Sequence, residues 1–360
     1  MNNEMGADKM KSHPIEDITS SEMTKLLGLK HAEIVDRELI LKNSYSKKIE
    51  KIRLRINSGK DTKDFFVKYG TTPSFIKEIL FYDALSQPVR DQITKLFSYQ
   101  FNPARYIMIF EWINGGNPDF LNKNVISNVF RDLGVFAASY EDPIIKYQHG
   151  NTGALLTGNT HYGKDKVEDL VNDLFVRKEN FNIFLELSGL AKRKVKSVNS
   201  IGGEKLAVFL MNCENGLIDR IIDTIYHMPL TIHPGDVSKF NLLIREPNNQ
   251  TVVLDYENIK IAPMCMLMEY IGEKDIHVPS ESLSTLALQS YLNGWNLKTE
   301  NKIDWRSFYN SYICSRIMYK FYLLGWWLKK EGSKRDPGRE WILNHVDDLS
   351  FLIDQIEKID

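Results

Sequence analysis

Residues 231–241 read Thr-Ile-His-Pro-Gly-Asp-Val-Ser-Lys-Phe-Asn, and a second carboxylate, Asp255, follows fourteen residues after Asn241. The run places the carboxylate of Asp236 and the amide of Asn241 five residues apart on one loop. The residues at 240–256 form two strand-like runs around Pro-Asn-Asn-Gln, which predicts a β-hairpin that begins in the loop and ends at Asp255. Three oxygen-bearing side chains can therefore converge on one point.

This arrangement suits phosphoryl transfer, in which a protein mainly positions groups and neutralises charge. One Asp accepts the proton of the attacking hydroxyl, while an Asn and a second Asp hold magnesium, which prefers oxygen ligands. The pattern predicts Asp236 as the base and Asn241 and Asp255 as metal ligands. The alternative for Asp236 and Asn241 is a purely structural role, as an Asx-turn in an ordinary loop. Lys239 either neutralises the migrating phosphoryl group or is a solvated surface lysine, and the residues leave both readings open.

The amino-terminal part of the chain predicts an antiparallel sheet. Ile52, Leu54 and Ile56 alternate with Lys and Arg up to an Asn-Ser-Gly turn, which indicates a half-buried strand, and residues 64–69 read as its return strand. A helix is expected next, because Thr-Pro-Ser offers a cap and a proline at the first helical position. The elements expected around this hairpin are a short helix after a capping box at 19–22, strands at 39–41, 95–101 and 106–112, and the helix at 72–85.

A lysine and a glutamate in this sheet form a candidate cation site. Lys68 lies on the third expected strand, and Glu78 lies on the helix face that packs on the sheet. A partly buried lysine held by a glutamate can reach the α- and β-phosphates of a nucleotide as a fixed positive charge. The alternative is a simple surface ion pair, worth about 0 to 1 kcal/mol.

In the order and spacing of these pieces, the chain resembles the aminoglycoside phosphotransferase and choline kinase group of small-molecule kinases, whose fold is protein-kinase-like. The resemblance implies ATP or GTP as the phosphoryl donor, Mg²⁺, and a hydroxyl of a small molecule as the acceptor. It implies that backbone groups around Phe110 and Trp112 bind the purine, and that a phosphate-covering loop lies near Ser44 and Ser46. The matching pieces, over about residues 20–330, are Val67-Lys68, Glu78 with Tyr82, 108–112 as the hinge, Gly235-Asp236-x4-Asn241, and Leu254-Asp255-Tyr256-Glu257.

The catalytic loop departs from the family pattern at one position. In the family a His stands two residues before the catalytic Asp, whereas here Pro234 takes that place and His233 lies one residue further upstream. This departure favours a rival reading, a nucleotide-binding kinase-like regulatory module without turnover, which the retained base and metal ligands oppose. A protein kinase is disfavoured, because Tyr256-Glu257 stands where Phe-Gly is expected. The P-loop-like run at 158–165 is expected to be a decoy, since an Asp replaces its Ser or Thr.

We therefore expect a two-lobed, protein-kinase-like α+β fold with an antiparallel-sheet lobe and a mainly helical lobe. Residues 1–18 are expected to be a flexible tail, 19–112 the nucleotide-binding lobe, and 113–360 the helical lobe with the catalytic loop, with ATP between the lobes. The acceptor pocket is expected to involve residues 167–226 and the helices after Glu269. Apart from the hairpin, the second lobe should be helical, and most aromatic side chains of its last hundred residues should belong to its core rather than to a cation–π box for an ammonium-bearing acceptor.

The composition sets outer limits on function. The chain has 360 residues with 46 Lys and Arg against 47 Asp and Glu, and this formal net charge of −1 gives no drive toward nucleic acid or an anionic membrane. Its three cysteines include no CxxC pair, so no disulfide framework or thiolate zinc site is expected. No secretory signal or membrane span is expected either. These properties predict a cytoplasmic protein and leave its oligomeric state open, while the small hydroxylated substrate is what the resemblance implies.

Overall fold

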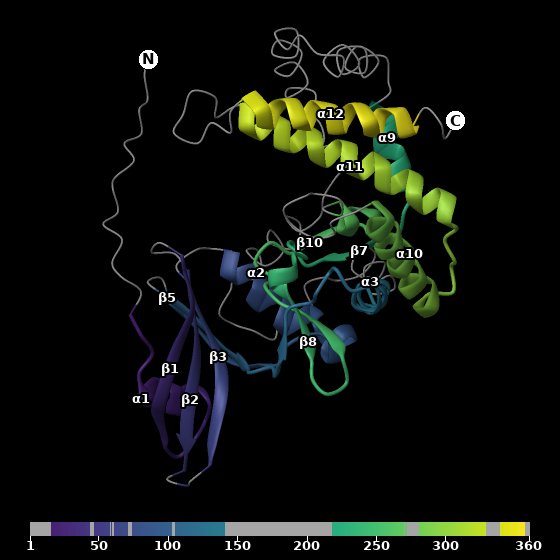
Figure 1. Cartoon of the computed structure of the whole chain (residues 1–360). Helices are drawn as coiled ribbons and strands as arrows, with labels where there is room; N and C mark the ends of the chain where they lie inside the picture. Colours follow the sequence, from purple (N-terminus) through teal and green to yellow (C-terminus); the bar gives the residue numbers. More distant parts are fainter. Residues whose placement is uncertain are drawn as a thin grey trace, which may run out of the picture. The chain divides into compact units, whose positions relative to one another are not determined.

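The computed structural model describes residues 16–43, 47–57, 59, 61–70, 74–102, 105–140, 218–269, 271, 281–328 and 339–356. The chain divides into two compact units. Unit 1 comprises Met1–Gly115, Arg245–Pro247 and Tyr256–Asn258, and unit 2 comprises Gly116–Ile244, Asn248–Asp255 and Ile259–Asp360. Each unit is described by itself below, with the labels of Figure 1.

Unit 1 is built on a five-stranded antiparallel sheet with strand order β1-β2-β3-β5-β4. In β2, side chains at alternate positions are buried, from Lys48 to Leu54, as expected for a strand with one face against a core. The helix inserted after the third strand is present as predicted. The strands, which overlap those predicted from the sequence and agree with 95–101 and 106–112 to within one residue at each end, are β1 (Ala32–Asn43), β2 (Lys47–Ile56), β3 (Thr62–Gly70), β4 (Leu96–Asn102) and β5 (Arg105–Glu111).

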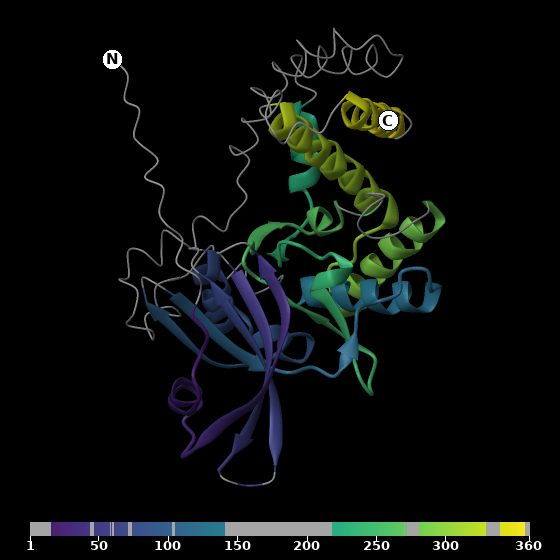
Figure 2. The same ribbon diagram turned by 60° about the vertical axis from the view of Figure 1, so that its left-hand side comes forward.

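Helices cover both faces of this sheet. On one face lies α1 (Ser20–Leu26), which begins with the predicted capping box between Thr19 and Glu22 and buries Met23 against the strands (Figure 2). On the other face lies α2 (Ser74–Leu80), whose Phe75 and Ile79 pack with core residues of β5. The predicted single helix over 72–85 is α2 followed by a π-helical turn (Phe81–Leu85), and a 3-10 segment (Gln87–Gln92) leads to β4.

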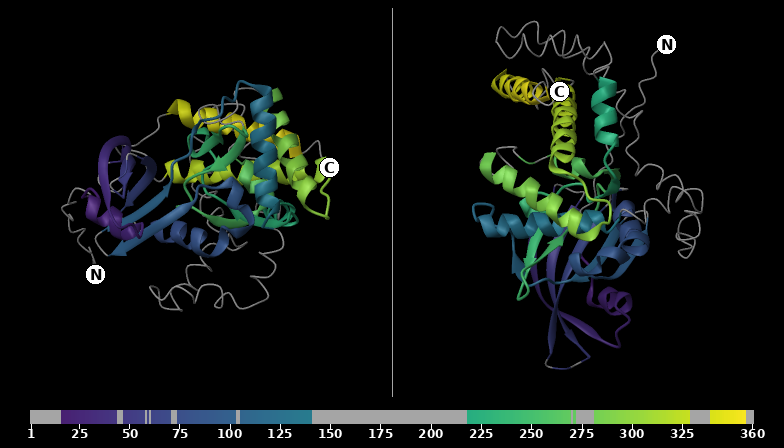
Figure 3. Two further views of the ribbon diagram at one scale, coloured as in Figure 1. Left: turned by 90° about the horizontal axis from the view of Figure 1, so that it is seen from below. Right: turned by 90° about the vertical axis from the view of Figure 1, so that its right-hand side faces the viewer.

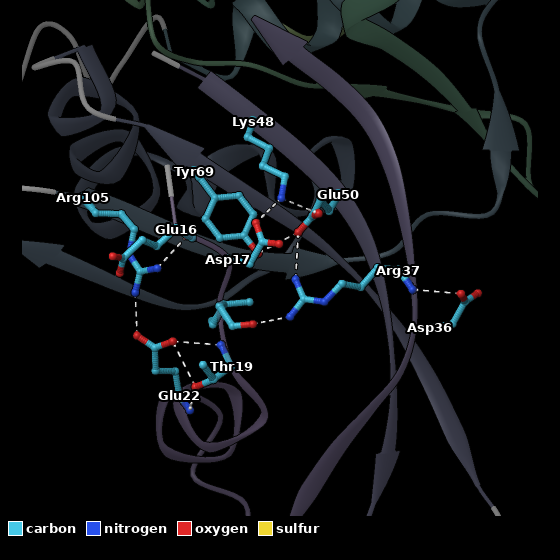
Figure 4. A network of polar contacts seen from close by, with 11 residues as sticks. Glu16, Asp17, Thr19, Glu22, Asp36, Arg37, Lys48, Glu50, Tyr69 and Arg105 are labelled. Carbon is cyan, nitrogen blue, oxygen red and sulfur yellow. Dashed lines mark hydrogen bonds and ion pairs between the residues drawn. The ribbon is translucent and has the colours of Figure 1, made fainter. Parts of the chain in front are cut away.

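The last residues of the predicted flexible tail are packed instead. Ile18 is fully buried in the cluster under α1, and the Ile18 carbonyl accepts a hydrogen bond from Arg37. Asp17 pairs with Lys48, and Arg105 donates to the backbone carbonyl of Glu16 at 2.7 Å (Figure 4). A single isoleucine after two acidic residues gives no periodic signal, so the docking of this segment onto the sheet could not be expected.

A buried ion cluster on β1, β2 and β3 lies next to this segment (Figure 4). The Glu50 carboxylate accepts from the Tyr69 hydroxyl at 2.9 Å and from Arg37 at 3.1 Å, and it pairs with Lys48 at 2.6 Å. Burial, reinforced by the negative charge of Glu50, raises the pKa of the Tyr69 hydroxyl. Burial opposes the charged form of Lys48, but hydrogen bonds to Asp17 and Glu50 outweigh it and raise the pKa of Lys48.

Helices make up most of the described part of unit 2. Figure 3 shows α3 (Lys123–Ala138) running alongside α10 (Glu281–Lys298), and the two helices cross at glycines. A Cβ atom on Gly134 would lie 2.0 Å from the carbonyl oxygen of Tyr291, and one on Gly294 would lie 2.0 Å from that of Arg131. The remaining helices are α9 (Ile218–Tyr226), α11 (Trp305–Leu328) and α12 (Arg339–Ile356), the last two at positions where helical spacing was recognised.

Unit 2 has more strands than the single predicted hairpin. The hairpin is present as β8 (Leu242–Arg245) and β9 (Gln250–Val253), and the two-residue strand β6 (Gly115–Gly116) pairs with β8. A second ribbon pairs β7 (Leu230–His233) with β10 (Lys260–Pro263). The strands of this ribbon were missed because they are short and, unlike β8 and β9, are not joined by a recognisable turn, since their pairing links segments about thirty residues apart.

Some aromatic side chains of α10 and α11 belong to the core: Tyr291, Trp295 and Phe308 are fully buried, and Tyr312 is 3% exposed. Trp305 and Tyr309 are partly exposed and stack on each other, with 5.3 Å between ring centroids. The side chains of Trp326 and Trp327 lie outside the described ones. In the parts of the chain that are described, no helix combines the length and the apolar character needed to cross a membrane. The decoy at 158–165 and nearly all of the expected acceptor region at 167–226 lie outside the described residues.

Candidate functional site

The cation site expected in unit 1 is present. Lys68 on β3 and Glu78 on α2 form an ion pair, and each side chain is only 2% exposed. The amine of Lys68 also lies 4.9 Å from the centre of the Phe75 ring. A lysine so enclosed is held in place by the carboxylate and the ring face beside it, and it cannot swing freely. This burial excludes the reading of the pair as a solvated surface salt bridge.

Residues that follow the hairpin complete this cluster within unit 1. The backbone N–H of Tyr256 donates to Glu78 at 3.3 Å, and the Tyr256 ring stacks on Phe81 with 3.8 Å between centroids. Glu257 lies 2.7 Å from the amine of Lys68 and 2.9 Å from that of Lys47. Glu257 and Lys47 were not among the predicted site residues, although Glu257 falls in the last matching motif and Lys47 directly follows the expected phosphate loop.

The expected purine-binding segment begins at the end of β5. The Phe110 side chain is buried and packs against Tyr82 and Phe66, so its ring serves the core. Trp112 is partly exposed, and the amine of Lys51 lies 4.3 Å from the centre of its ring. Purine binding by backbone groups of this segment stays a prediction, and Ser44 and Ser46 lie outside the described residues.

In unit 2, His233 supports the loop of Asp236 in spite of the altered spacing. Its Nδ1 accepts the backbone N–H of Gly235 at 2.9 Å, and its Nε2 lies 3.2 Å from the carbonyl of Met266. Gly235 has a φ of 110°, a conformation that residues with a Cβ rarely adopt. The glycine thus accommodates the extra residue, and the loop retains an internal histidine.

The hydrogen bonds fix the protonation state of His233. Because Nδ1 accepts a hydrogen bond, the ring proton must reside on Nε2, from which it is donated to Met266. The side chain is fully buried, and burial together with the positive charge of Lys260 lowers the pKa of His233 well below its usual value. The loop is therefore held by a neutral imidazole.

The side chains of the loop are arranged around the exposed Asp236. One Asp236 carboxylate oxygen accepts the N–H of Ser238 at 2.8 Å, and the backbone carbonyl of Asp236 accepts the amide Nδ2 of Asn241 at 3.1 Å. The first bond forms the Asx-turn that was the non-catalytic alternative for these residues, and it also fixes the direction of the carboxylate. Lys239 is exposed, with its amine 5.2 Å from the centre of the Phe240 ring.

Backbone hydrogen bonds bring the two predicted metal ligands of unit 2 into register. The N–H of Leu254 donates to the carbonyl of Asn241 at 2.8 Å, so the residue before Asp255 is fastened to Asn241. Asp255 itself has a positive φ of 62°, which turns the chain as it leaves the hairpin. The Asn117 side chain donates to the carbonyls of Lys239 and Leu242, at 2.9 and 3.0 Å, and braces the loop from outside. No pattern in the sequence indicates this role of Asn117.

The oxygen donors of this loop are of the chemical type that magnesium binds. Because Nδ2 of Asn241 is used in the bond to Asp236, Oδ1 is the atom that can serve a metal, and Asp255 supplies a carboxylate. Amide and carboxylate oxygens are hard ligands of the type that Mg²⁺ takes in sites that also hold nucleotide phosphates.

The antiparallel sheet with one inserted helix, followed by a helical unit that carries the Asp236 loop and a hairpin, defines a protein-kinase-like fold. Solved structures with this fold include an aminoglycoside phosphotransferase from Alicyclobacillus acidocaldarius, with a TM-score of 0.52, 11% identity, and coverage of 98% of this chain and 96% of that one. The chain is also similar to the choline kinase from Cryptosporidium parvum, with a TM-score of 0.51, 14% identity and 90% coverage of both chains. For the ethanolamine kinase from Plasmodium vivax the TM-score is 0.50, with 13% identity and coverage of 90% of this chain and 84% of that one.

No protein-family model matches the sequence, and no curated protein is significantly similar to it. The structural likeness confirms the α+β kinase-like fold that the motifs predicted, the fold of the aminoglycoside phosphotransferase and choline kinase group.

Proposed function

We propose that the protein is a small-molecule kinase, which transfers the γ-phosphoryl group of ATP to a hydroxyl of a sugar, an aminoglycoside or aminocyclitol, or an amino alcohol. The observation that carries this proposal is the braced loop of unit 2, in which one exposed carboxylate and one amide are held in fixed register with a hairpin that ends in a second carboxylate. The names of the three similar structures pair phosphoryl transfer with a small acceptor.

In this proposal Asp236 accepts the proton of the acceptor hydroxyl. The hydroxyl oxygen forms a bond to the γ-phosphorus, the bond from that phosphorus to the β–γ bridging oxygen breaks, and ADP leaves. Lys68, held by Glu78, binds the phosphates, while Asn241 and Asp255 hold Mg²⁺, which neutralises phosphate charge when bound. Lys239, exposed on the same loop as Asp236, is assigned to the migrating phosphoryl group.

The argument for a regulatory, nucleotide-binding module is weakened by the position of His233. The displaced histidine was the main argument for a nucleotide-binding module without turnover, but His233 still accepts the Gly235 N–H. An exposed carboxylate oriented by a backbone N–H is what a base requires, and a module that only binds nucleotide has no use for it.

Purified protein mixed with Mg-ATP and a panel of sugars, aminoglycosides and amino alcohols tests the proposal through release of ADP. With an active acceptor, Asp236→Ala should lower turnover by about 10²-fold or more, because the proton acceptor is removed. The exposed Asp36 on β1 provides a matched control, and Asp36→Ala should retain wild-type turnover. Unchanged turnover in Asp236→Ala would remove the base assignment. Nucleotide binding with no acceptor modified across the panel would instead favour the regulatory module.

A further inference from the structure

Two lysines of unit 1 meet at a single carboxylate oxygen. Oε1 of Glu257 lies 2.7 Å from the amine of Lys68 and 2.9 Å from that of Lys47. The side chain of Lys47 is 15% exposed, that of Lys68 is 2% exposed, and that of Glu257 is 14% exposed. Such a convergence of two ammonium groups on one oxygen is the arrangement that a phosphate oxygen also accepts.

The sheet register places both lysines on one face. Lys47 on β2 lies opposite Gly70 on β3, and Ile49 lies opposite Lys68, so residues 47, 49, 68 and 70 share a face. Gly70 adds no side chain there, and a Cβ atom at this position would lie 2.0 Å from the ring of Phe75. The same ring lies against the amine of Lys68. The floor of the cluster is therefore built from an aromatic ring and a glycine, beside which the two amines converge.

We propose that Lys47 is a second phosphate-binding cation of the nucleotide site, and that Glu257 is a built-in anion that takes the place of a phosphate oxygen until nucleotide arrives. The inference rests on the proposed function and deepens it. In the free protein, Glu257 is the carboxylate that the two amines share. When Glu257 turns away, a phosphate oxygen can take its place beside both amines. Binding of the diphosphate group is thus an exchange of one anion for another.

A merely structural role for these ion pairs makes a different prediction. If Glu257 only fastens the segment Tyr256–Asn258 to the sheet, then removing either partner loosens the same contact, and both changes should weaken nucleotide binding. If Glu257 competes with the phosphates, removal of Lys47 weakens binding and removal of the Glu257 charge strengthens it. The opposite signs of the two effects separate the readings.

The test is calorimetric titration of the full chain with ADP and with adenosine, in the presence of EDTA so that no metal takes part. Lys47→Met should weaken ADP binding by about tenfold or more, the loss of one charge-assisted hydrogen bond, and should leave adenosine binding unchanged. Glu257→Gln should tighten ADP binding, and Lys47→Arg should restore most of the wild-type affinity. Lys63, exposed on β3, provides the matched control, and Lys63→Met should bind ADP as the wild type does.

Three results would overturn the inference: unchanged ADP affinity in Lys47→Met, an equal loss of ADP and adenosine affinity in that variant, or weaker ADP binding in Glu257→Gln. Thermal unfolding of each variant without ligand identifies any that fail to fold, and if Lys47→Met does not fold, the direction of the change in Glu257→Gln carries the test. If the wild type binds neither ADP nor adenosine, the proposed function itself fails. Wild-type binding with unaltered variants rejects only the roles given to Lys47 and Glu257.

Discussion

His233 can support the loop of Asp236 in only one protonation state. Its Nδ1 accepts the N–H of Gly235, and a proton at that nitrogen would place two donors against each other. The buried ring also lies in the positive field of Lys260. Protonation therefore requires that the loop open, and the stability of unit 2 becomes coupled to pH.

The direction of this coupling follows from the lowered pKa. The unfolded chain takes up the proton near pH 6.5, whereas the folded chain stays neutral to a much lower pH, so the stabilisation is complete above about pH 6.5 and is lost as the pH falls. Between pH 6.5 and 5, the free energy of unfolding should fall by about 2 kcal/mol through this group. Urea unfolding at a series of pH values measures the slope, which should be smaller in His233→Asn. An identical slope in His233→Asn and the wild type would contradict the assignment.

Single residues differ in how far the sequence predicts their roles. The pairing of Lys68 with Glu78 and of Asp236 with Asn241 could be predicted from the kinase-like spacing, and the structure brings each pair together. The support given by Asn117 could not be foreseen, because it depends on a contact with the carbonyl of Leu242, 125 residues away. Contacts of this kind leave no periodic signal.

At the scale of elements, the crossing of α3 and α10 is set by two glycines. Helices can approach this closely only where side chains are missing, and a Cβ on Gly134 would overlap the carbonyl of Tyr291. A glycine in the interior of a helix ordinarily costs stability relative to alanine, so its presence here has a packing reason.

Gly134→Ala should therefore destabilise the protein although it improves helix propensity. We expect a loss of about 1 to 3 kcal/mol, the usual cost of overpacking, in denaturant unfolding. Asn128→Ala, on the exposed face of the same helix, should change the free energy of unfolding by less than about 0.5 kcal/mol. A stabilised Gly134→Ala protein would show that the two helices can move apart without cost.

The sheet in unit 1 offers a comparison of buried and exposed charge. Removing the Glu50 charge leaves Arg37 and Lys48 partly buried beside a neutral amide, and Glu50→Gln should cost about 3 kcal/mol. Glu33→Gln breaks the exposed pair with Arg55, whose side chain is 45% exposed, and should cost about 0 to 1 kcal/mol. Chemical denaturation of both variants measures the difference. Equal effects would mean that Asp17 compensates fully for the missing charge.

Elements could be predicted from the sequence where their period was long enough to read. Alternation over β2 and helical spacing over α11 extend through many residues, and both elements were expected. The ribbon of β7 and β10 has four residues in each strand, and pairing between segments about thirty residues apart stabilises it. That stabilisation is tertiary, so local propensity does not show it.

At the scale of the whole molecule, nucleotide binding should appear as added stability. A ligand that binds only the folded state raises the free energy of unfolding by about 2.7 kcal/mol when present at 100 times its dissociation constant. Lys68→Met should abolish this increase with ADP, because the fixed cation is lost, whereas Asp236→Ala should retain it. Thermal unfolding with and without ADP, compared within each variant, separates this effect from the instability that loss of the buried ion pair with Glu78 causes by itself. An ADP-dependent shift of wild-type size in Lys68→Met would remove the lysine from the nucleotide site.

The packing of residues 16–18 has a practical consequence for anyone preparing shortened forms of the protein. A shortened chain that begins at Thr19, just before the first helix, would lose Ile18 from the hydrophobic cluster and Asp17 from its pair with Lys48. It would also expose the sheet face on which α1 packs. Affinity tags and fusion partners should accordingly be attached upstream of Glu16.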